Sequence, residues 1–265
     1  MPPKHNILGI LVSQTDYADA TEQIIRAAQS RQSMAVTALA VHGVMEGVSD
    51  PEHKYRLNQF DLVCPDGQPV RWALNALHRC GLSDRVYGPT LTLRVCAAAA
   101  EAGVPIFLFG ADEATLADLS ESLVTQFKGL KIAGTKPSAF GKITEAEADA
   151  LADEINRSGA GVCFVGLGCP RQEVFAYEMR DRINMPLIAV GAAFAFHAGR
   201  LAQAPPWMQR IGMEWFYRLV KEPRRLFHRY ATTNPAYVAG VALQKIGWGR
   251  DPEDARKPGQ PIRYG

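Results

Sequence analysis

The stretch LVCPDGQPV, residues 62–70, ends an apolar run in a carboxylate and a glycine. Asp66 follows this run directly, and a helical pattern begins near Gln68. A carboxylate at the carboxyl end of a parallel strand can accept a proton from a substrate hydroxyl, and Gly67 would let the substrate approach the backbone. An aspartate before a helix can equally cap that helix, and position alone favours the cap.

Thr37 lies near the end of another apolar run, MAVTALA, and could likewise have a functional or a structural role. Its hydroxyl could face a ligand at the end of the strand. A threonine of this kind can also be hydrogen-bonded within the fold. Spacing alone favours the second interpretation.

The segment GLGCPRQE, residues 166–173, joins an apolar run to a helical pattern through Gly166 and Gly168. Backbone amides in such a turn, together with a helix N-terminus, could hold an anion such as a nucleotide phosphate. The segment matches neither the GxGxxG fingerprint nor a loop ending in GK[ST]. Its sequence therefore disfavours a dehydrogenase and a P-loop enzyme.

Two further loops carry polar residues at predicted strand ends. The segment VYGPTLTLR places Gly88 before a helix, with Arg85 and Arg94 nearby. His197 follows a strand end bounded by glycine and could contact a substrate. A histidine between two phenylalanines is, however, more typical of a hydrogen-bonded packing residue. Together these loops predict a cleft large enough for a nucleotide.

Short apolar runs alternate with longer segments of helical period, and this alternation predicts the scaffold. The expected strands are residues 7–12, 34–40, 62–64, 105–109, 131–134, 162–166 and 187–190. The expected helices are residues 16–31, 69–78, 91–102, 114–127, 144–156 and 171–182. Strands that are apolar on both faces are typical of parallel sheets covered by helices. The pattern predicts a doubly wound, mostly parallel, Rossmann-like α/β sheet.

The composition changes after Gly199. Between residues 200 and 245, basic side chains outnumber acidic ones eight to two and alternate with Trp, Phe and Tyr. Pro205-Pro206 predicts the start of one helix, and Pro223 predicts the start of another helix or a kink. We expect an α/β core over residues 1–199, a basic, aromatic helical appendage over 200–250 and a loose polar tail over 251–265. Such an appendage favours an anionic membrane surface over nucleic acid, because no nucleic-acid-binding motif accompanies it.

The overall composition is that of an ordinary globular protein, with 265 residues, 47% hydrophobic residues and a net charge of +2. The five cysteines are dispersed without a CxxC pair, so we expect reduced thiols and neither a disulfide framework nor a zinc site. The N-terminus lacks the apolar region of a signal peptide, and no run reaches the ~18 apolar residues of a membrane span. These features predict a cytoplasmic protein.

Five ordered motifs closely resemble the WecG/TagA/CpsF family of glycosyltransferases. They are VTALAVHGVME, DGQPVRWAL, RVYGPTLTL, VGLGCPRQE and the long block from VGAAFAFHAGRLAQ to GMEWFYRLVKEPRRLFHRY. The resemblance implies an inverting, metal-independent transferase without a cofactor. It implies transfer of a hexose-type sugar, such as N-acetylmannosamine or its uronic acid, from a UDP-sugar donor to a polyprenyl-diphosphate-linked sugar acceptor. The setting would be cell-surface polysaccharide assembly, with the protein peripherally associated with the inner face of the cell membrane.

The resemblance also implies roles for residues in the core. Asp66 matches the proposed general base, which would deprotonate the acceptor hydroxyl, and Thr37 matches a threonine near the reacting centre. Gln172 matches an active-site glutamine, and Glu173 would support the helix behind it. The turns at Gly166, Gly168 and Gly88 would bind substrate.

In the appendage, Arg218, Arg224 and Arg225 match arginines that would close over the site and neutralise the diphosphate. A guanidinium group suits this role because it stays charged and can bind two phosphate oxygens at once.

Four positions depart from the commoner family pattern, namely Leu39, Thr90, Ala195 and Gln203. They leave the reaction class intact and bear on the identity of the donor sugar and the acceptor. A catalytically silent nucleotide-sugar-binding subunit is one alternative function. A Rossmann-type oxidoreductase is another, disfavoured because the glycine-rich turn lacks the third glycine. A homo-oligomer stays open.

Overall fold

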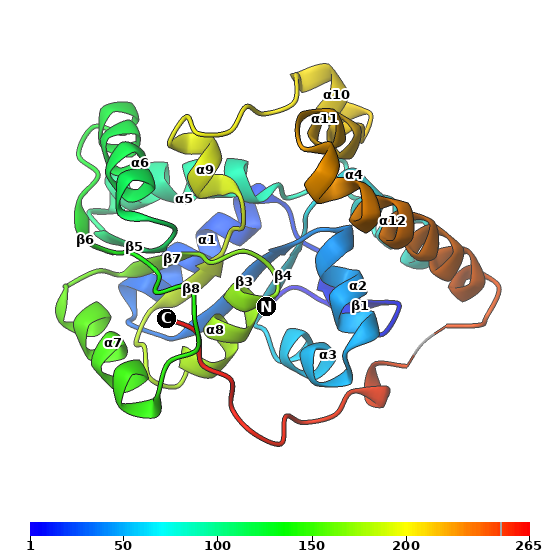
Figure 1. Ribbon diagram of the computed structural model, residues 1–265, viewed down its shortest axis with the longest axis horizontal. Helices are drawn as coiled ribbons and strands as arrows, with labels where there is room; N and C mark the ends of the chain where they lie inside the picture. The colour runs from blue at the N-terminus through cyan, green and yellow to red at the C-terminus, as the bar shows by residue number, and fades with distance from the viewer. Residues whose placement is uncertain (250) are drawn as a thin grey trace.

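The computed structural model describes residues 1–249 and 251–265, except for the side chain of Arg225. A six-stranded parallel sheet, in the order β4-β3-β8-β7-β5-β6, forms its centre (Figure 1). The strands are β3 (Met34–Leu39), β4 (Leu62–Pro65), β5 (Ile106–Gly110), β6 (Ile132–Lys136), β7 (Val162–Gly166) and β8 (Pro186–Ala189). The predicted α/β class is confirmed.

The expected strand over residues 7–12 is wrong. The chain forms instead an antiparallel hairpin of β1 (Lys4–Ile7) and β2 (Ile10–Ser13). Leu8 and Gly9 form its turn with φ of 56° and 90°, and positive φ at both positions is typical of a tight two-residue turn. The turn was missed because Leu8, which lies at the bend, is an apolar residue that is buried, so it continues the apolar pattern of a strand. The Val63 N–H donates to the Ser13 hydroxyl at 3.0 Å and ties the hairpin to β4.

Helices cover both faces of the sheet (Figure 1). One face is covered by α2 (Val41–Ser49), α3 (Pro51–Asn58), α7 (Glu145–Arg157) and α8 (Arg171–Met179). The other face is covered by α1 (Tyr17–Gln29), α5 (Gly88–Ala102), α6 (Glu113–Gln126) and α9 (Ala193–His197). Alternate residues of β3 supply the two cores, with Ala35 facing the α8 side and Val36 the α5 side.

Three helices of the core, α2, α3 and α9, were absent from the sequence prediction. The start of α3 carried a readable signal, because the Asp50 side chain accepts from the Glu52 N–H at 2.8 Å and Pro51 occupies the first turn. The next helix, α4 (Gln68–His78), packs beside β1. The start of α7 shows Thr144 and Glu147 in a reciprocal capping box.

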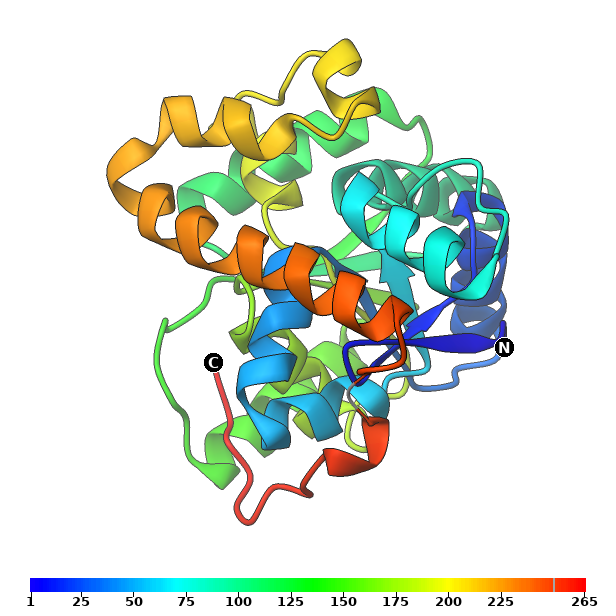
Figure 2. The ribbon, with the colours of Figure 1, turned by 90° about the vertical axis from the view of Figure 1, so that its right-hand side faces the viewer.

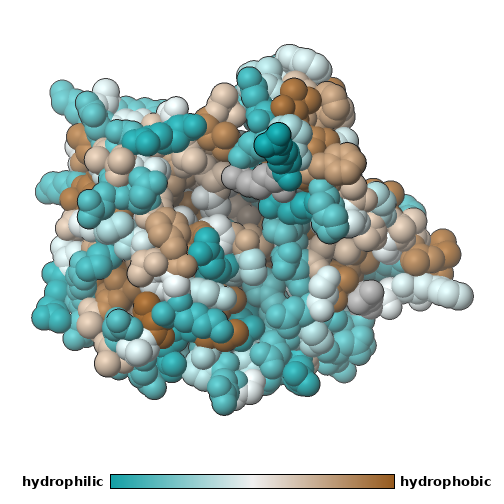
Figure 3. Space-filling view, viewed as in Figure 1, coloured by the Kyte–Doolittle hydropathy of each residue, from teal (hydrophilic) through white to brown (hydrophobic). Residues whose placement is uncertain are grey.

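The appendage consists of α10 (Pro206–Arg210), α11 (Glu214–Lys221) and α12 (Pro223–Lys245). Helices α10 and α12 begin at two of the prolines that predicted helix starts. Helix α12 crosses α2 and α4 (Figure 2). Tyr237 anchors α12 by donating from its hydroxyl to the Pro69 carbonyl at 3.2 Å. Brown, apolar surface is visible in Figure 3 in the region of α10 and α11. The exposed large apolar residues of the appendage include Trp207, Ile211, Phe216, Val220 and Phe227.

The last fifteen residues run back across the molecule and are attached to it, so the expectation of a loose tail is wrong. The Arg256 N–H donates to the Pro51 carbonyl at 3.0 Å. Farther on, Tyr264 forms an antiparallel bridge with Lys142, and the Ser138 hydroxyl donates to the Gly265 carbonyl at 2.5 Å. Backbone pairing of this kind could not be read from a polar, proline-rich composition.

Candidate active site

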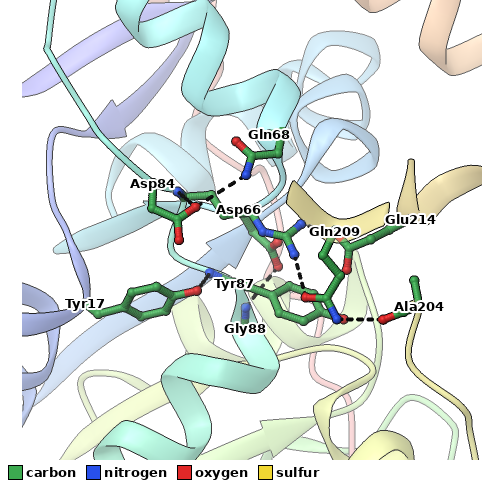
Figure 4. Close-up of polar contacts among 10 residues, drawn as sticks. Tyr17, Asp66, Gln68, Asp84, Tyr87, Gly88, Ala204, Gln209 and Glu214 are labelled. Atoms are coloured by element: carbon green, nitrogen blue, oxygen red, sulfur yellow. Dashed lines mark hydrogen bonds and ion pairs between the residues drawn. The ribbon is translucent and has the colours of Figure 1, made fainter. Parts of the chain in front are cut away.

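Asp66 lies at the carboxyl edge of the sheet, directly after β4. The N-cap position of α4 is occupied by Gly67, and no side chain caps that helix. Asp66 points instead toward α5, where its Oδ2 atom accepts from the Gly88 N–H at 3.2 Å (Figure 4). The interpretation of Asp66 as a helix cap is therefore wrong.

Gly88 lets α5 start close to the edge of the sheet. A Cβ atom at this position would lie 3.2 Å from both the Val190 carbonyl oxygen and the Ala38 Cβ, closer than ordinary van der Waals contact. The absence of a side chain thus lets the first amide of α5 reach Asp66. The helix N-terminus adds a favourable dipole for the negative charge.

The electrostatic surroundings of Asp66 suit a base that works near neutral pH. The side chain is partly buried, and this burial raises its pKa to about 7. The charges of Arg85 and Arg218 and the Gly88 N–H lower the pKa, whereas Glu214 raises it. A carboxylate with a pKa close to the working pH can both accept and release a proton.

Arg85 connects this carboxylate to the appendage. Its Nη1 atom pairs with Glu214 of α11, and its Nη2 atom donates to the Gln209 side chain of α10 at 3.2 Å (Figure 4). The guanidinium lies over the Tyr87 ring, 4.2 Å from its centroid. The Tyr87 N–H in turn donates to the Tyr17 hydroxyl at 3.0 Å. The sequence placed Arg85 only near a helix start, and its partners in the appendage could not be predicted from either motif.

A second carboxylate, Glu173 of α8, lies on the opposite face of the sheet and is 1% exposed. Its Oε1 atom accepts from the Thr37 hydroxyl at 3.1 Å and from the Gln172 side chain at 2.8 Å. Gln172 also accepts from the Gly191 N–H at 2.9 Å. Burial raises the pKa of Glu173. Glu173 thus links its own helix to β3 and, through Gln172, to Gly191, which is more than the helix support expected of it.

Thr37 and Asp66 point to different sides of the sheet. Thr37 shares the face of Ala35 and Leu39 and binds Glu173, whereas Asp66 binds the start of α5 on the other face. The structure therefore brings Thr37 together with Gln172 and not with Asp66. The hydrogen bond of its hydroxyl agrees with the interpretation of a satisfied threonine.

The glycine-rich turn after β7 is open where a ligand could approach it. Gly168 has φ of 78°, and a Cβ atom there would have no neighbour within 4 Å. Its carbonyl accepts from the Gln172 N–H at 3.0 Å, at the start of α8. Gly166 has a packing role, because a Cβ atom there would lie 2.5 Å from the Phe194 ring.

Basic side chains face this edge from the appendage. Arg218 and Arg229 each have a buried Nε atom without a hydrogen-bond partner among the described residues. Burial, followed by the charges of Arg229 and Arg218, lowers the pKa of His42 at the start of α2 to about 4. The two arginines thus create a partly buried basic region next to α2, in which Arg218 also pairs with Glu222 at 3.7 Å, and an anion could bind there.

The three arginines singled out from the sequence have different settings. Arg218 lies in the basic region, close enough to affect the charge of Asp66, and Arg224 is exposed on α12. The side chain of Arg225 lies outside the described residues. Arg229 belongs to the same basic run, but the break between α11 and α12 prevented its direction from being predicted.

Other predicted positions have structural settings. His197 contacts the Pro89 carbonyl through Nε2 at 2.9 Å, as expected of a packing residue. Among the departures from the family pattern, Leu39 is buried, Thr90 contacts the Tyr17 hydroxyl, Ala195 is partly buried and Gln203 is exposed.

Within residues 1–249 and 251–265, no group of three or more His, Cys, Asp or Glu side chains is arranged to hold a metal ion. In that same part of the chain, none of the helices combines the length and the apolar character needed to cross a bilayer.

The fold and the site together define a Rossmann-like α/β protein with a carboxylate at the carboxyl edge of its sheet and arginines supplied by a helical appendage. Residues 5–251 match the model of the glycosyl transferase WecG/TagA/CpsF family, and the chain therefore belongs to that family. It is a glycosyltransferase of cell-surface polysaccharide biosynthesis, and the family implies a nucleotide-sugar donor and a lipid-linked acceptor. The match confirms the resemblance and removes the oxidoreductase alternative.

Proposed function

We propose that this chain is an inverting, metal-independent transferase that moves a hexose-type sugar from a UDP-sugar to a polyprenyl-diphosphate-linked saccharide. N-acetylmannosamine and a hexuronic acid are the donor sugars that we favour. The observation that carries the proposal is Asp66, held by the first amide of α5 with a pKa of about 7. Arg85 and Arg218 provide positive charge beside it.

In the proposed reaction, Asp66 accepts the proton of the acceptor hydroxyl as its oxygen attacks the anomeric carbon of the donor. The bond from that carbon to the diphosphate oxygen breaks, and the electron pair leaves with UDP. One displacement of this kind inverts the anomeric configuration and needs one base. The diphosphate gains charge during the step, and fixed positive groups stabilise that charge best where water is excluded.

We assign the diphosphate to the region between the glycine-rich turn and the appendage. Arg218 and Arg229 have buried donors without partners among the described residues, and such donors are costly to leave unpaired. Gly168 offers an open backbone position, and Arg229 lies close enough to act electrostatically on Cys169, the next residue. Gln172, fixed by Glu173 and Gly191, would meet the nucleotide or sugar at the same edge.

The appendage would also bind the anionic surface of the inner face of the cell membrane, where a polyprenyl acceptor resides. Trp207 and Phe227 are 59% and 65% exposed, and the exposed Lys221 and Arg224 shortly precede Phe227 in the sequence. Aromatic side chains enter the interfacial region of a bilayer, while basic side chains attract anionic headgroups. This combination supports peripheral attachment.

The test is a transfer assay with the full chain, a UDP-sugar and a polyprenyl-diphosphate-linked acceptor, in the presence of excess EDTA. We expect UDP release that requires both substrates, and a product whose anomeric configuration is opposite to that of the donor. Retained configuration would contradict the single displacement. Loss of activity in EDTA with recovery on adding Mg²⁺ or Mn²⁺ would contradict metal independence. UDP binding without transfer to any acceptor would favour the silent subunit.

A further inference from the structure

The appendage reaches the proposed base through one buried side chain. Arg85 belongs to the core and is only 4% exposed, yet its guanidinium binds Glu214 of α11 and Gln209 of α10. Arg85 and Glu214 are 129 positions apart in the sequence. The contact is therefore a junction between the two parts of the chain and not a local feature of either.

The same guanidinium is coupled to Asp66. It stacks on the ring of Tyr87, the residue before Gly88, whose N–H holds the Asp66 carboxylate. Its charge also acts directly on Asp66, while the charge of Glu214 acts in the opposite sense. Arg85 thus lies between two carboxylates, one from the core and one from the appendage.

Stability alone is a weak reason for such an arrangement. Removing an arginine and a carboxylate from water has a large desolvation cost, and their attraction offsets that cost only when the geometry is good. The pair does fix the position of the planar Arg85 guanidinium. One of its nitrogens donates to Glu214, the other donates to the Gln209 side chain, and the Tyr87 ring lies against its face.

We propose, building on the function above, that Glu214 is a positioning residue that holds Arg85 beside Asp66, so that docking of α10 and α11 completes the charge environment of the base. Without Glu214, the guanidinium would lose its strongest partner and turn toward Asp66. Without Arg85, the base would face Glu214 directly. The two losses therefore act on Asp66 in opposite directions.

The charged and titratable groups that face Asp66 come from several elements. They are Tyr17 of α1, Arg85 and Tyr87 before α5, and Glu214 and Arg218 of α11, together with the N–H of Gly88. Neutralising Glu214 leaves positive charge in excess and lowers the pKa of Asp66. Neutralising Arg85 leaves negative charge in excess and raises that pKa.

The experiment compares the pH dependence of kcat/KM for Glu214→Gln, Arg85→Gln and the double variant, each in the full chain. We expect the acidic limb to move by roughly half to one pH unit, downward in Glu214→Gln and upward in Arg85→Gln. In the double variant the limb should lie between the two, and this variant contains no unpaired buried charge that could prevent folding. Glu154→Gln, which removes an exposed partner of Lys136, is the matched control and should leave the limb in place.

A second measurement does not depend on turnover. The Asp66 carboxyl signal can be titrated by ¹³C NMR, assigned from its absence in Asp66→Asn, and should shift with the same signs. If the parent transfers no sugar but these shifts appear, the coupling stands and the proposed function fails. If the parent transfers sugar and Glu214→Gln lowers the rate equally at every pH with no shift, Glu214 is only a structural contact and the inference is wrong.

Discussion

Two carboxylates lie at the carboxyl edge of the sheet, and they differ in what their surroundings leave them free to do. Glu173 is 1% exposed and already accepts from Thr37 and Gln172. Asp66 is only partly buried and, among the described residues, accepts one hydrogen bond, from the Gly88 N–H. Burial raises the pKa of both groups. The comparison shows that a raised pKa identifies a candidate base only when the carboxylate can also be reached.

The difference is reflected in the nature of their partners. Around Glu173 the groups that bind Oε1 are a neutral hydroxyl and a neutral amide, the Cys169 thiol is a further neutral neighbour, and Oε2 is buried without a hydrogen-bond partner among the described residues. Around Asp66 the partners include Arg85, Arg218 and Glu214, whose charges set the pH at which it ionises. We therefore interpret Glu173 as a group that organises Thr37 and Gln172, and Asp66 as the group that exchanges a proton.

The largest expected effect comes from replacing each carboxylate, Asp66 or Glu173, by the corresponding amide. Asp66→Asn should lower kcat by roughly 10²- to 10⁴-fold with UDP affinity nearly unchanged, because the amide cannot accept the proton. Glu173→Gln should cost less than about tenfold, because an amide can still hold its neighbours. The control is Asp153→Asn on the exposed face of α7. If Asp66→Asn and Glu173→Gln lower kcat equally, the distinction drawn between the two carboxylates is wrong.

The next effect concerns the basic region formed by Arg218 and Arg229, where we place the diphosphate. Arg218→Gln should reduce transfer by about 10²- to 10³-fold, the size expected when a fixed donor to developing charge is lost. The same change should raise the pKa of His42 from about 4, because a nearby positive charge is removed. Transfer rates and ¹H NMR titration of His42 measure the two effects.

UDP binding to the parent should likewise raise the pKa of His42, since the diphosphate neutralises Arg218 and Arg229. An unchanged His42 titration in saturating UDP would place the diphosphate elsewhere.

A smaller effect is expected at the outer face of the appendage. Each basic residue near an anionic bilayer contributes ~1 kcal/mol, so Lys221→Glu with Arg224→Glu should weaken binding to anionic vesicles by roughly 30-fold or more at low salt. Salt should reduce the difference. Lys128→Glu with Lys131→Glu, exposed ahead of β6, is the matched control. Vesicle sedimentation measures the binding. If both double variants bind equally well, the proposal that the appendage binds the membrane is wrong.

Parts of this comparison could be predicted from the sequence. The apolar runs before Asp66 and Gly166 located strand ends, and parallel strands bring such ends to one edge. The face of the sheet to which each side chain points could not be predicted, since it depends on the pairing and twist of strands that are distant in the sequence. The family resemblance placed Thr37 near the reacting centre, whereas its hydroxyl binds Glu173 on the opposite side from the Asp66 contact.

The contacts between the core and the appendage could not be predicted from the sequence either. Arg85 and Glu214 each lie in a recognisable motif, but nothing in either motif indicates that one binds the other across the junction. The hairpin turn at Leu8 was missed for a related reason, because a buried leucine gives no sign of a bend. Local patterns reveal elements and their ends, while long-range packing determines which ends meet.

The most direct test of the central claim is the pH dependence of kcat/KM in the parent enzyme and in Asp66→Asn. Burial raises the pKa of Asp66 to about 7, so protonation should remove the base as the pH falls through that value. We predict an acidic limb near pH 7 in the parent, with the rate falling about tenfold for each pH unit below it, and no such limb in the residual activity of the variant. A parent profile that is flat from pH 5.5 to 8, or an unchanged limb in Asp66→Asn, would contradict the assignment of Asp66 as the base.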